Sequence, residues 1–106
     1  MTDFAELTMR LTGFDWDGGN AEKNRARNGV SRNEAEEVFF NRPVLVAESM
    51  KHSTGEPRYL LLGRTKTERR LAVIFTVRGD LVRVISARPM SRKERTRYAK
   101  VPNEGL

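Results

Sequence analysis

The stretch that decides the fold runs from Arg70 to Tyr98 and reads RLAVIFTVRGDLVRVISARPMSRKERTRY. Its first two parts, residues 71–77 and 81–87, are rich in Val, Ile, Leu and Phe, which is typical of β-strands. Between them, Gly79-Asp80 suits a two-residue type II′ turn, because that turn favours glycine in its first position. The stretch therefore predicts a β-hairpin followed by a short basic helix.

The two-residue turn also predicts which side chains share a face of the hairpin. It places Arg78 opposite Leu81 and Thr76 opposite Arg83, and faces alternate along each strand. An almost wholly apolar face, which we expect to receive the helices, then carries Leu71, Val73, Phe75, Val77, Val82, Val84, Ser86 and Arg88. A mixed face carries Ala72, Ile74, Thr76, Arg78, Leu81, Arg83, Ile85 and Ala87.

Two arginines, Arg78 and Arg83, lie close together on this mixed face near the turn. A pair of guanidinium groups on a sheet face predicts a phosphate-binding position, because the guanidinium fork matches phosphate geometry. The alternative is that both side chains simply extend to water at the edge of the sheet. Spacing alone favours that alternative.

Length and composition indicate one small globular domain. The chain has 106 residues, 38% of them hydrophobic, and we assign residues 1–13 to an N-terminal extension and 101–106 to a tail. It contains no cysteine and a single histidine, His52, which excludes disulfides, thiolate zinc sites and multi-histidine metal centres. Without a membrane-length apolar run or a signal pattern, we expect a cytoplasmic protein that does not enter the membrane.

Charge is distributed unevenly along the chain. Residues 1–50 carry six Lys and Arg against nine Asp and Glu, whereas residues 51–106 carry fourteen against five. This asymmetry predicts one surface that faces anions, either nucleic acid or an acidic protein. Solvated surface charge is the alternative that composition leaves open.

The remaining elements follow from capping signals and apolar periodicity. Helices are predicted over 20–28, from the capping box Ser31–Glu34 to Asn41, and from the capping box Ser91–Glu94 to about Lys100. Strands are predicted over 14–17, 44–48 and 58–64, besides the hairpin, and a short amphipathic helix over 2–12. The predicted class is α+β, with an antiparallel meander of four to five strands, an N-terminal helical hairpin and a C-terminal helix.

Few side chains in the sequence suit proton transfer. His52 is the one whose unperturbed pKa lies near neutrality, although a loop histidine is more often a surface residue. Asp15 and Asp17 share a strand face and could bind a metal, but a solvated or helix-capping role is favoured. Metal-free RNA cleavage needs only the 2′-hydroxyl nucleophile, a proton acceptor and cations near the phosphate, and the chain contains these groups.

Short blocks between residues 14 and 98 follow one another in a recognisable order and spacing. The blocks are Trp16-Asp17, Gly19-Asn20, Lys23-Asn24, Gly29-Val30-Ser31, Glu34–Phe39, Lys51-His52-Ser53, Glu56–Tyr59, Gly63-Arg64, Phe75–Arg78, Arg83–Arg88, Arg92–Arg95 and Tyr98. Together they resemble the BrnT family of toxins from type II toxin–antitoxin modules. The resemblance implies a RelE-like sheet architecture and a ribonuclease that inhibits translation. It also implies a cognate antitoxin, usually a ribbon-helix-helix protein that represses the operon.

One block departs from the family pattern. Family members usually carry Lys-His-Gly-Val where this chain has Arg27-Asn28-Gly29-Val30. Asparagine forms hydrogen bonds but does not exchange protons near neutrality, so either the family histidine is structural or this copy is attenuated. We favour the structural explanation, because the position ends a helix.

Taken together, the sequence predicts a toxin endoribonuclease that acts without metal or cofactor. Arg78 and Arg83 are the expected phosphate-binding residues, with Arg64 as a further catalytic candidate and His52 as the proton-transfer candidate. RNA-binding candidates are Lys51, Arg88, Arg92, Lys93, Arg95 and Arg97, although strand alternation places Arg88 on the opposite face from Arg83. Operator DNA would be contacted only through the antitoxin. The alternative is a catalytically weak or inactive module of the same fold that binds RNA or an antitoxin.

Overall fold

The computed structural model describes residues 12–16, 20–49 and 57–102. In chain order its elements are β1 (Gly13–Phe14), α2 (Asn20–Asn28), α3 (Arg32–Glu37), β2 (Leu45–Ser49), β3 (Arg58–Arg64), β4 (Arg70–Arg78), β5 (Leu81–Pro89) and α4 (Arg92–Ala99). The helix expected over 2–12 lies outside the described residues. No helix in the described ranges is long and apolar enough to cross a membrane.

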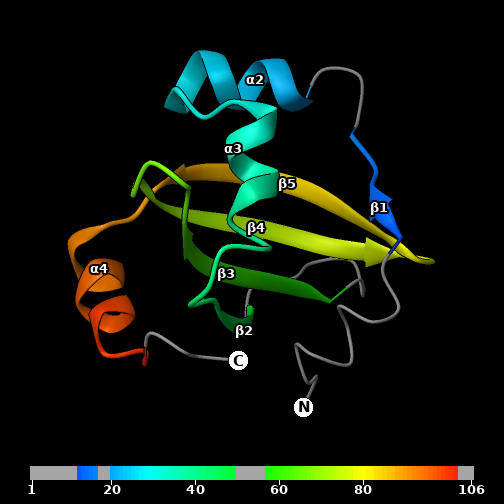
Figure 1. The fold of residues 1–106 in the computed structure, drawn as a ribbon. Coiled ribbons are helices and arrows are strands. Elements are labelled where there is room, and N and C mark those ends of the chain that lie inside the picture. Colours follow the sequence, from blue (N-terminus) through cyan, green and yellow to red (C-terminus); the bar gives the residue numbers. More distant parts are fainter. Residues whose placement is uncertain (1–11, 17–19, 50–56, 103–106) are drawn as a thin grey trace.

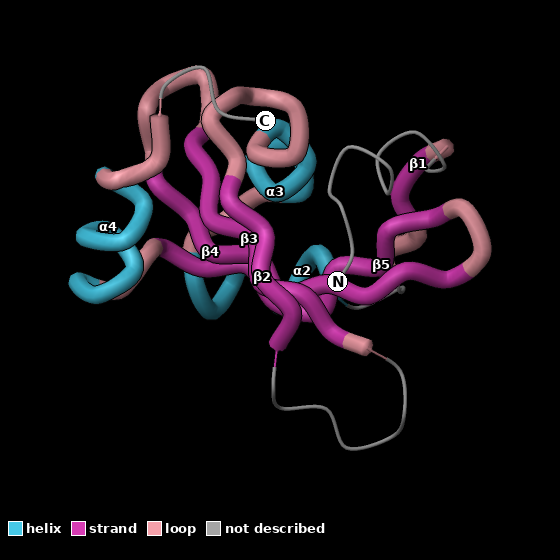
Figure 2. The backbone as a smooth tube through the Cα atoms, turned by 90° about the horizontal axis from the view of Figure 1, so that it is seen from below, coloured by secondary structure: helices cyan, strands magenta, loops and turns pink. Residues whose placement is uncertain are grey.

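The strands form one five-stranded sheet with the order β1-β5-β4-β3-β2. Strands β2 to β5 are antiparallel neighbours, which confirms the predicted meander and the α+β class. The short β1 joins the β5 edge in the parallel direction, with Gly13 opposite Leu81 and Phe14 opposite Val82. Figures 1 and 2 both place β1 and α4 at opposite ends of the sheet.

The hairpin turn between β4 and β5 has the predicted geometry and register. Gly79, the first residue of the turn, has a φ of 60°. Asp80, the second, does not have a positive φ; among the described non-glycine residues a positive φ occurs at Glu68. This is the pattern of a type II′ turn. Arg78 pairs with Leu81 and Thr76 with Arg83, as expected.

Beyond Val84 the predicted register is wrong, because β5 contains a bulge. Phe75 pairs with Val84 but Ile74 pairs with Ser86, so Ile85 is an extra residue on β5. From Ser86 onward every β5 side chain therefore moves to the face opposite the one predicted. Ala87 now pairs with Val73, and Arg88 with Ala72.

We call the side of the sheet that carries Val73 and Phe75 the first face, and it packs against α2 and α3. The core on this face consists of hydrophobic side chains. The ring of Phe39, from the turn after α3, packs edge to face on the ring of Phe75, with the ring centroids 5.0 Å apart. Its buried members are Val30, Ala35, Val38, Phe39, Val44, Tyr59, Leu61, Leu71, Val73, Phe75, Val82, Val84 and Ala87.

The opposite, second face is covered at one end by α4, which corrects the expectation that all helices pack on the first face. Tyr98 of α4 packs with Leu62, Ala72 and Met90, and its hydroxyl donates a 2.6 Å hydrogen bond to the carbonyl of Pro43. Burial raises the pKa of Tyr98, because it disfavours the phenolate. We call the part of the second face that α4 covers the helix end, and the part near the β4–β5 turn the turn end.

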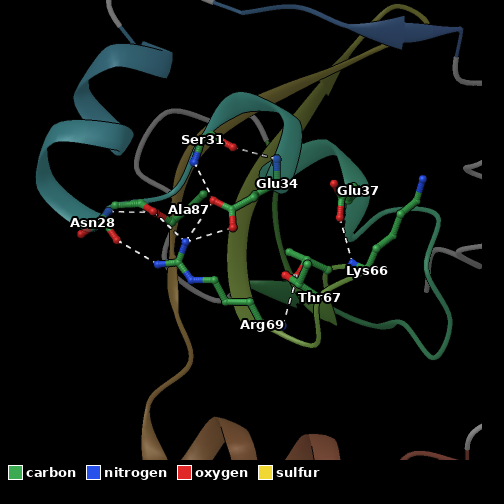
Figure 3. Close-up of polar contacts among 10 residues, drawn as sticks. Asn28, Ser31, Glu34, Glu37, Lys66, Thr67, Arg69 and Ala87 are labelled. Atoms are coloured by element: carbon green, nitrogen blue, oxygen red, sulfur yellow. Dashed lines mark hydrogen bonds and ion pairs between the residues drawn. The ribbon is translucent and has the colours of Figure 1, made fainter.

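Helices α2 and α3 are joined at a corner that Arg69 holds (Figure 3). Arg69 donates to the carbonyl of Gly29 at 2.7 Å and to both carboxylate oxygens of Glu34 at 3.0 and 3.1 Å. Glu34 also completes the predicted capping box with Ser31. In Figure 1, α3 turns away from the direction of α2, so the structure does not confirm a helical hairpin. Helix α3 ends at Glu37, before the predicted Asn41, because residues 38–40 form tighter turns.

Candidate functional site

The turn end of the second face brings together the two arginines that the sequence singled out. Arg83 is half-buried on β5 beside Thr76 of β4, and Arg78 is exposed at the end of β4. The Thr76 side chain is buried, and its hydroxyl donates a 2.7 Å hydrogen bond to the carbonyl of Pro57. The backbone of β5 at Arg83 therefore lies between β4 on one side and β1 on the other, and this fixes the position from which the side chain projects.

Arg58 is a third arginine at this end that the sequence analysis did not select. Alternation along β3 places Arg58 on the second face with Leu60 and Leu62, and its side chain is half-buried. The strand order puts β4 between Arg58 and Arg83, a distance of about two strand spacings or ~10 Å. Only the β3–β4 register brings Arg58 to this face, so the local sequence pattern could not identify it.

Asp15 lies next to Arg83 on the other side. The backbone N–H of Asp15 donates to the carbonyl of Val82 at 2.7 Å, which extends the parallel pairing of β1 by one residue. The Asp15 carboxylate is 3.7 Å from Arg83 Nη1. Asp15 thus pairs with an arginine, whereas the sequence analysis favoured a solvated or helix-capping role.

Arg64 does not join this group, although the sequence predicted it as a catalytic candidate. Arg64 on β3 pairs with Arg70 on β4. Arg70 is six residues along β4 from Thr76, the partner of Arg83, so the two positions on β4 are about 20 Å apart. The Arg64 guanidinium donates to Glu68 at 3.2 Å and to the carbonyl of Arg42 at 3.0 Å. Arg64 is thus engaged with the loops at the helix end.

Arg88 shares the second face with Arg83 because of the bulge, which corrects the predicted opposite orientation. However, Arg88 lies at the helix end and forms a bidentate ion pair with Glu94. Its Nη1 and Nη2 atoms donate to the two carboxylate oxygens at 2.7 and 2.9 Å. This pairing, with the Ser91 backbone N–H in the α4 capping box, lowers the pKa of Glu94 to about 2. The same contact raises the pKa of Arg88. The Arg88–Glu94 ion pair therefore connects β5 to α4.

The remaining predicted site residues, the RNA-binding candidates and the proton-transfer candidate His52, divide into two groups. Arg92, Lys93, Arg95 and Arg97 are exposed on α4, at the helix end. Lys51 and His52 lie outside the described residues. Within the ranges that the structure describes, the candidate cations therefore gather at two separate ends of one sheet face.

Asn28, which the sequence analysis singled out as a departure from the resembled pattern, makes a structural contact. Its side-chain Nδ2 donates a 2.8 Å hydrogen bond to the carbonyl of Ala87. One helical turn earlier, the buried Asn24 accepts a 3.1 Å hydrogen bond from the N–H of the same Ala87. The two amides attach α2 to the outer edge of β5 next to the bulge.

Comparisons with known proteins agree with this fold. A family model described as "Ribonuclease toxin, BrnT, of type II toxin-antitoxin system" matches residues 16–94. The 1.1 Å crystal structure of the Brucella abortus ribonuclease toxin BrnT matches with a TM-score of 0.56 and 24% identity, covering 77% of this chain and 100% of that one. No match is found among the curated proteins. Because the family model spans well over half of the sequence, the chain belongs to the BrnT family of ribonuclease toxins of type II toxin–antitoxin systems.

Proposed function

We propose that this chain is a toxin that cuts RNA in the cytoplasm of its host, without metal, and thereby inhibits translation. The observation that carries the proposal is the position of Arg83, which is half-buried on β5 with Arg58 and Arg78 at the same end of the second face. Fixed guanidinium groups stabilise the charge that develops on a phosphate during cleavage. The RelE-like architecture implied by the resemblance belongs to this proposal.

The chemistry requires no group beyond RNA and protein side chains. The 2′-oxygen attacks the adjacent phosphorus as a base removes its proton, the bond to the 5′-oxygen breaks, and that oxygen takes up a proton. The products are a 2′,3′-cyclic phosphate and a free 5′-hydroxyl. Arg78 and Arg83 would bind the phosphate, and His52 is the proposed proton carrier.

RNA would extend from the turn end toward the helix end of the same face. The exposed Arg92, Lys93 and Arg95 of α4 would then hold the backbone through charge. Arg64 and Arg88 contribute less to this surface, because both are engaged in internal contacts. This assignment makes α4 a binding element rather than part of the reacting centre.

The partner would be a cognate antitoxin, which we infer to be of the ribbon-helix-helix type. It would neutralise the toxin and would carry the contact with operator DNA. Expression of the chain alone should arrest growth of its host, and co-expression of the antitoxin should restore growth.

The decisive experiment is RNA cleavage by the purified chain in the presence of a metal chelator, on free RNA and on translating ribosomes. Arg83→Ala should reduce cleavage ~100-fold or more. Arg27→Ala is the matched control, because Arg27 is an exposed arginine on α2 and its loss changes the net charge equally. Binding of RNA without cleavage on either substrate would instead favour the inactive binding module. Equal activity of Arg83→Ala and the wild type would refute the placement of the site.

A further inference from the structure

Among the residues that the structure describes, one large hydrophobic side chain faces solvent. Phe40 follows α3 and is 70% exposed, whereas its neighbour Phe39 is buried in the core of the first face. The ring of Phe40 packs edge to face on the half-buried ring of Phe14, with the ring centroids 6.2 Å apart. Trp16, two positions beyond Phe14, is also half-buried. We call Phe14, Trp16 and Phe40 the aromatic patch.

The backbone around Phe40 is held on both sides. The N–H of Phe40 donates to the carbonyl of Glu37 at 3.0 Å, within the turn that ends α3. The side-chain amide of the next residue, Asn41, donates to the carbonyls of Arg64 and Thr65, both at 3.0 Å. Because a phenylalanine ring on fixed backbone has few rotatable bonds, its burial against a partner costs little conformational entropy. Such a ring is typical of an anchor residue in a protein interface.

The border of the aromatic patch is acidic. Residues 32–40, which comprise α3 and the turn after it, contain three glutamates against one arginine. Glu36 accepts a 2.7 Å hydrogen bond from the indole N–H of Trp16, and its side chain is still 31% exposed. The one arginine, Arg32, lies over the Trp16 ring, and its Nε is 3.6 Å from the Glu36 carboxylate. This border therefore repels nucleic acid and favours a partner with basic groups.

The aromatic patch lies on the other side of the sheet from the arginines of the candidate site. The ring of Phe14 packs on the ring of Phe39, with centroids 5.2 Å apart, and Phe39 belongs to the core of the first face. Arg58 and Arg83 project from the second face. A partner can therefore bind the aromatic patch through contacts that do not include these arginines.

We propose that the aromatic patch is a docking surface for the antitoxin, and that the antitoxin segment bound there presents apolar side chains flanked by Lys or Arg. The family consists of toxins of type II toxin–antitoxin systems, so an antitoxin is the protein partner of this chain. Its apolar side chains bury the Phe40 ring, and its basic groups meet the carboxylates of α3. The inference rests on the antitoxin named in the proposed function and does not depend on the cleavage reaction.

The experiment measures binding of the purified chain to the protein encoded by the neighbouring reading frame, since a toxin and its antitoxin form one module. Phe40→Ser should weaken binding ~30-fold or more, the loss typical of an anchor residue. Phe40→Leu keeps a large apolar side chain and should lose less than about tenfold. Ala26→Ser, at an exposed position on α2, is the control and should stay within about twofold of the wild type. Wild-type binding should be weaker at about 1 M salt than at about 0.1 M, because salt screens the charge attraction.

Stability and toxicity show whether the effect is confined to the interface. Because Phe40 is largely exposed, Phe40→Ser should unfold within about 3 °C of the wild type. The variant expressed alone should cut RNA and arrest growth as the wild type does. Co-expression of the antitoxin should restore growth with the wild type but not with Phe40→Ser.

The outcomes separate this inference from the proposed function. Weaker antitoxin binding in Phe40→Ser, with unchanged stability and cleavage, supports the docking surface. Binding equal to the wild type overturns it and leaves the ribonuclease function standing, and so does a dimer of the free chain that Phe40→Ser dissociates without loss of antitoxin affinity. Binding that salt does not weaken overturns the basic flank, and a wild type that does not bind the neighbouring protein overturns the docking surface with its partner. A wild type that binds the antitoxin through Phe40 but cuts no RNA overturns the ribonuclease function alone.

Discussion

Replacing Glu94 with glutamine should destabilise the protein near neutral pH, because Glu94 joins α4 to β5 through Arg88. Glutamine keeps the side-chain oxygen that accepts from the Ser91 N–H in the capping box. The substitution removes the charge that faces Arg88, and it replaces the oxygen that accepts from Arg88 Nη2 with an amide N–H donor. The native pKa of Glu94 is lowered from 4.5 to about 2 by that pairing, and the Glu94 side chain is only 16% exposed.

The size of the effect follows from this pKa. A shift of this size corresponds to about 3 kcal/mol of stabilisation as an upper limit. Because the Arg88 side chain is 39% exposed, solvent screens the pair, and about 1–2 kcal/mol is the expected loss of unfolding free energy. For a chain of this length, that loss lowers the melting temperature by about 5–10 °C.

The dependence on pH gives the sharpest test of the pair. A carboxyl whose folded pKa is lowered contributes stability that is fully present above its unfolded pKa, here near 4.5, and is lost as the pH falls toward the folded value of about 2. Urea unfolding of the wild type and Glu94→Gln should therefore differ at pH 7 and converge near pH 2. Glu48→Gln, at an exposed position in β2, should stay within about 0.5 kcal/mol of the wild type. A difference below that limit at pH 7, or one that persists unchanged at pH 2, would refute the assigned role of the pair.

Three further substitutions test other contacts. Asn28→Ala should lower the unfolding free energy by about 1–2 kcal/mol, measured by urea unfolding, since it leaves the Ala87 carbonyl without its side-chain donor. Gly63→Ala should cost about 1–3 kcal/mol in the same assay, because an added Cβ would lie 2.9 Å from the carbonyl oxygen of Val38; an unchanged midpoint would contradict this packing. Arg69→Lys should destabilise the corner between α2 and α3 by about 1–2 kcal/mol, since one ammonium cannot reproduce the contacts of the guanidinium fork, and thermal unfolding will show whether it does.

The local elements of the fold could be predicted from the sequence because their signals are local. The capping boxes at Ser31 and Ser91, the turn at Gly79 and the strand composition each act within a few residues, and all four appear in the structure. The bulge at Ile85 could not be predicted in this way. It coincides with contacts from α2, where Asn24 and Asn28 hold the Ala87 peptide across more than fifty positions of sequence.

The same limit applies to the candidate site. Alternation from the turn correctly placed Arg78 and Arg83, since no irregularity separates them from Gly79. It failed for Arg88, which lies beyond the bulge, and it gave no information on Arg58 or Asp15. Those two reach the site through the pairing of β3 with β4 and of β1 with β5, and such pairings depend on tertiary structure.

The attachment of Ala87 to α2 gives this protein an internal reporter of helix detachment. The amide hydrogen of Ala87 is held by the side chain of Asn24 and not by a neighbouring strand. Its exchange with solvent deuterium therefore follows the opening of α2 away from the edge of β5, whereas amides bonded between central strands exchange only when the sheet itself opens. An NMR signal from this one peptide would thus measure the free energy of α2 docking in the intact protein.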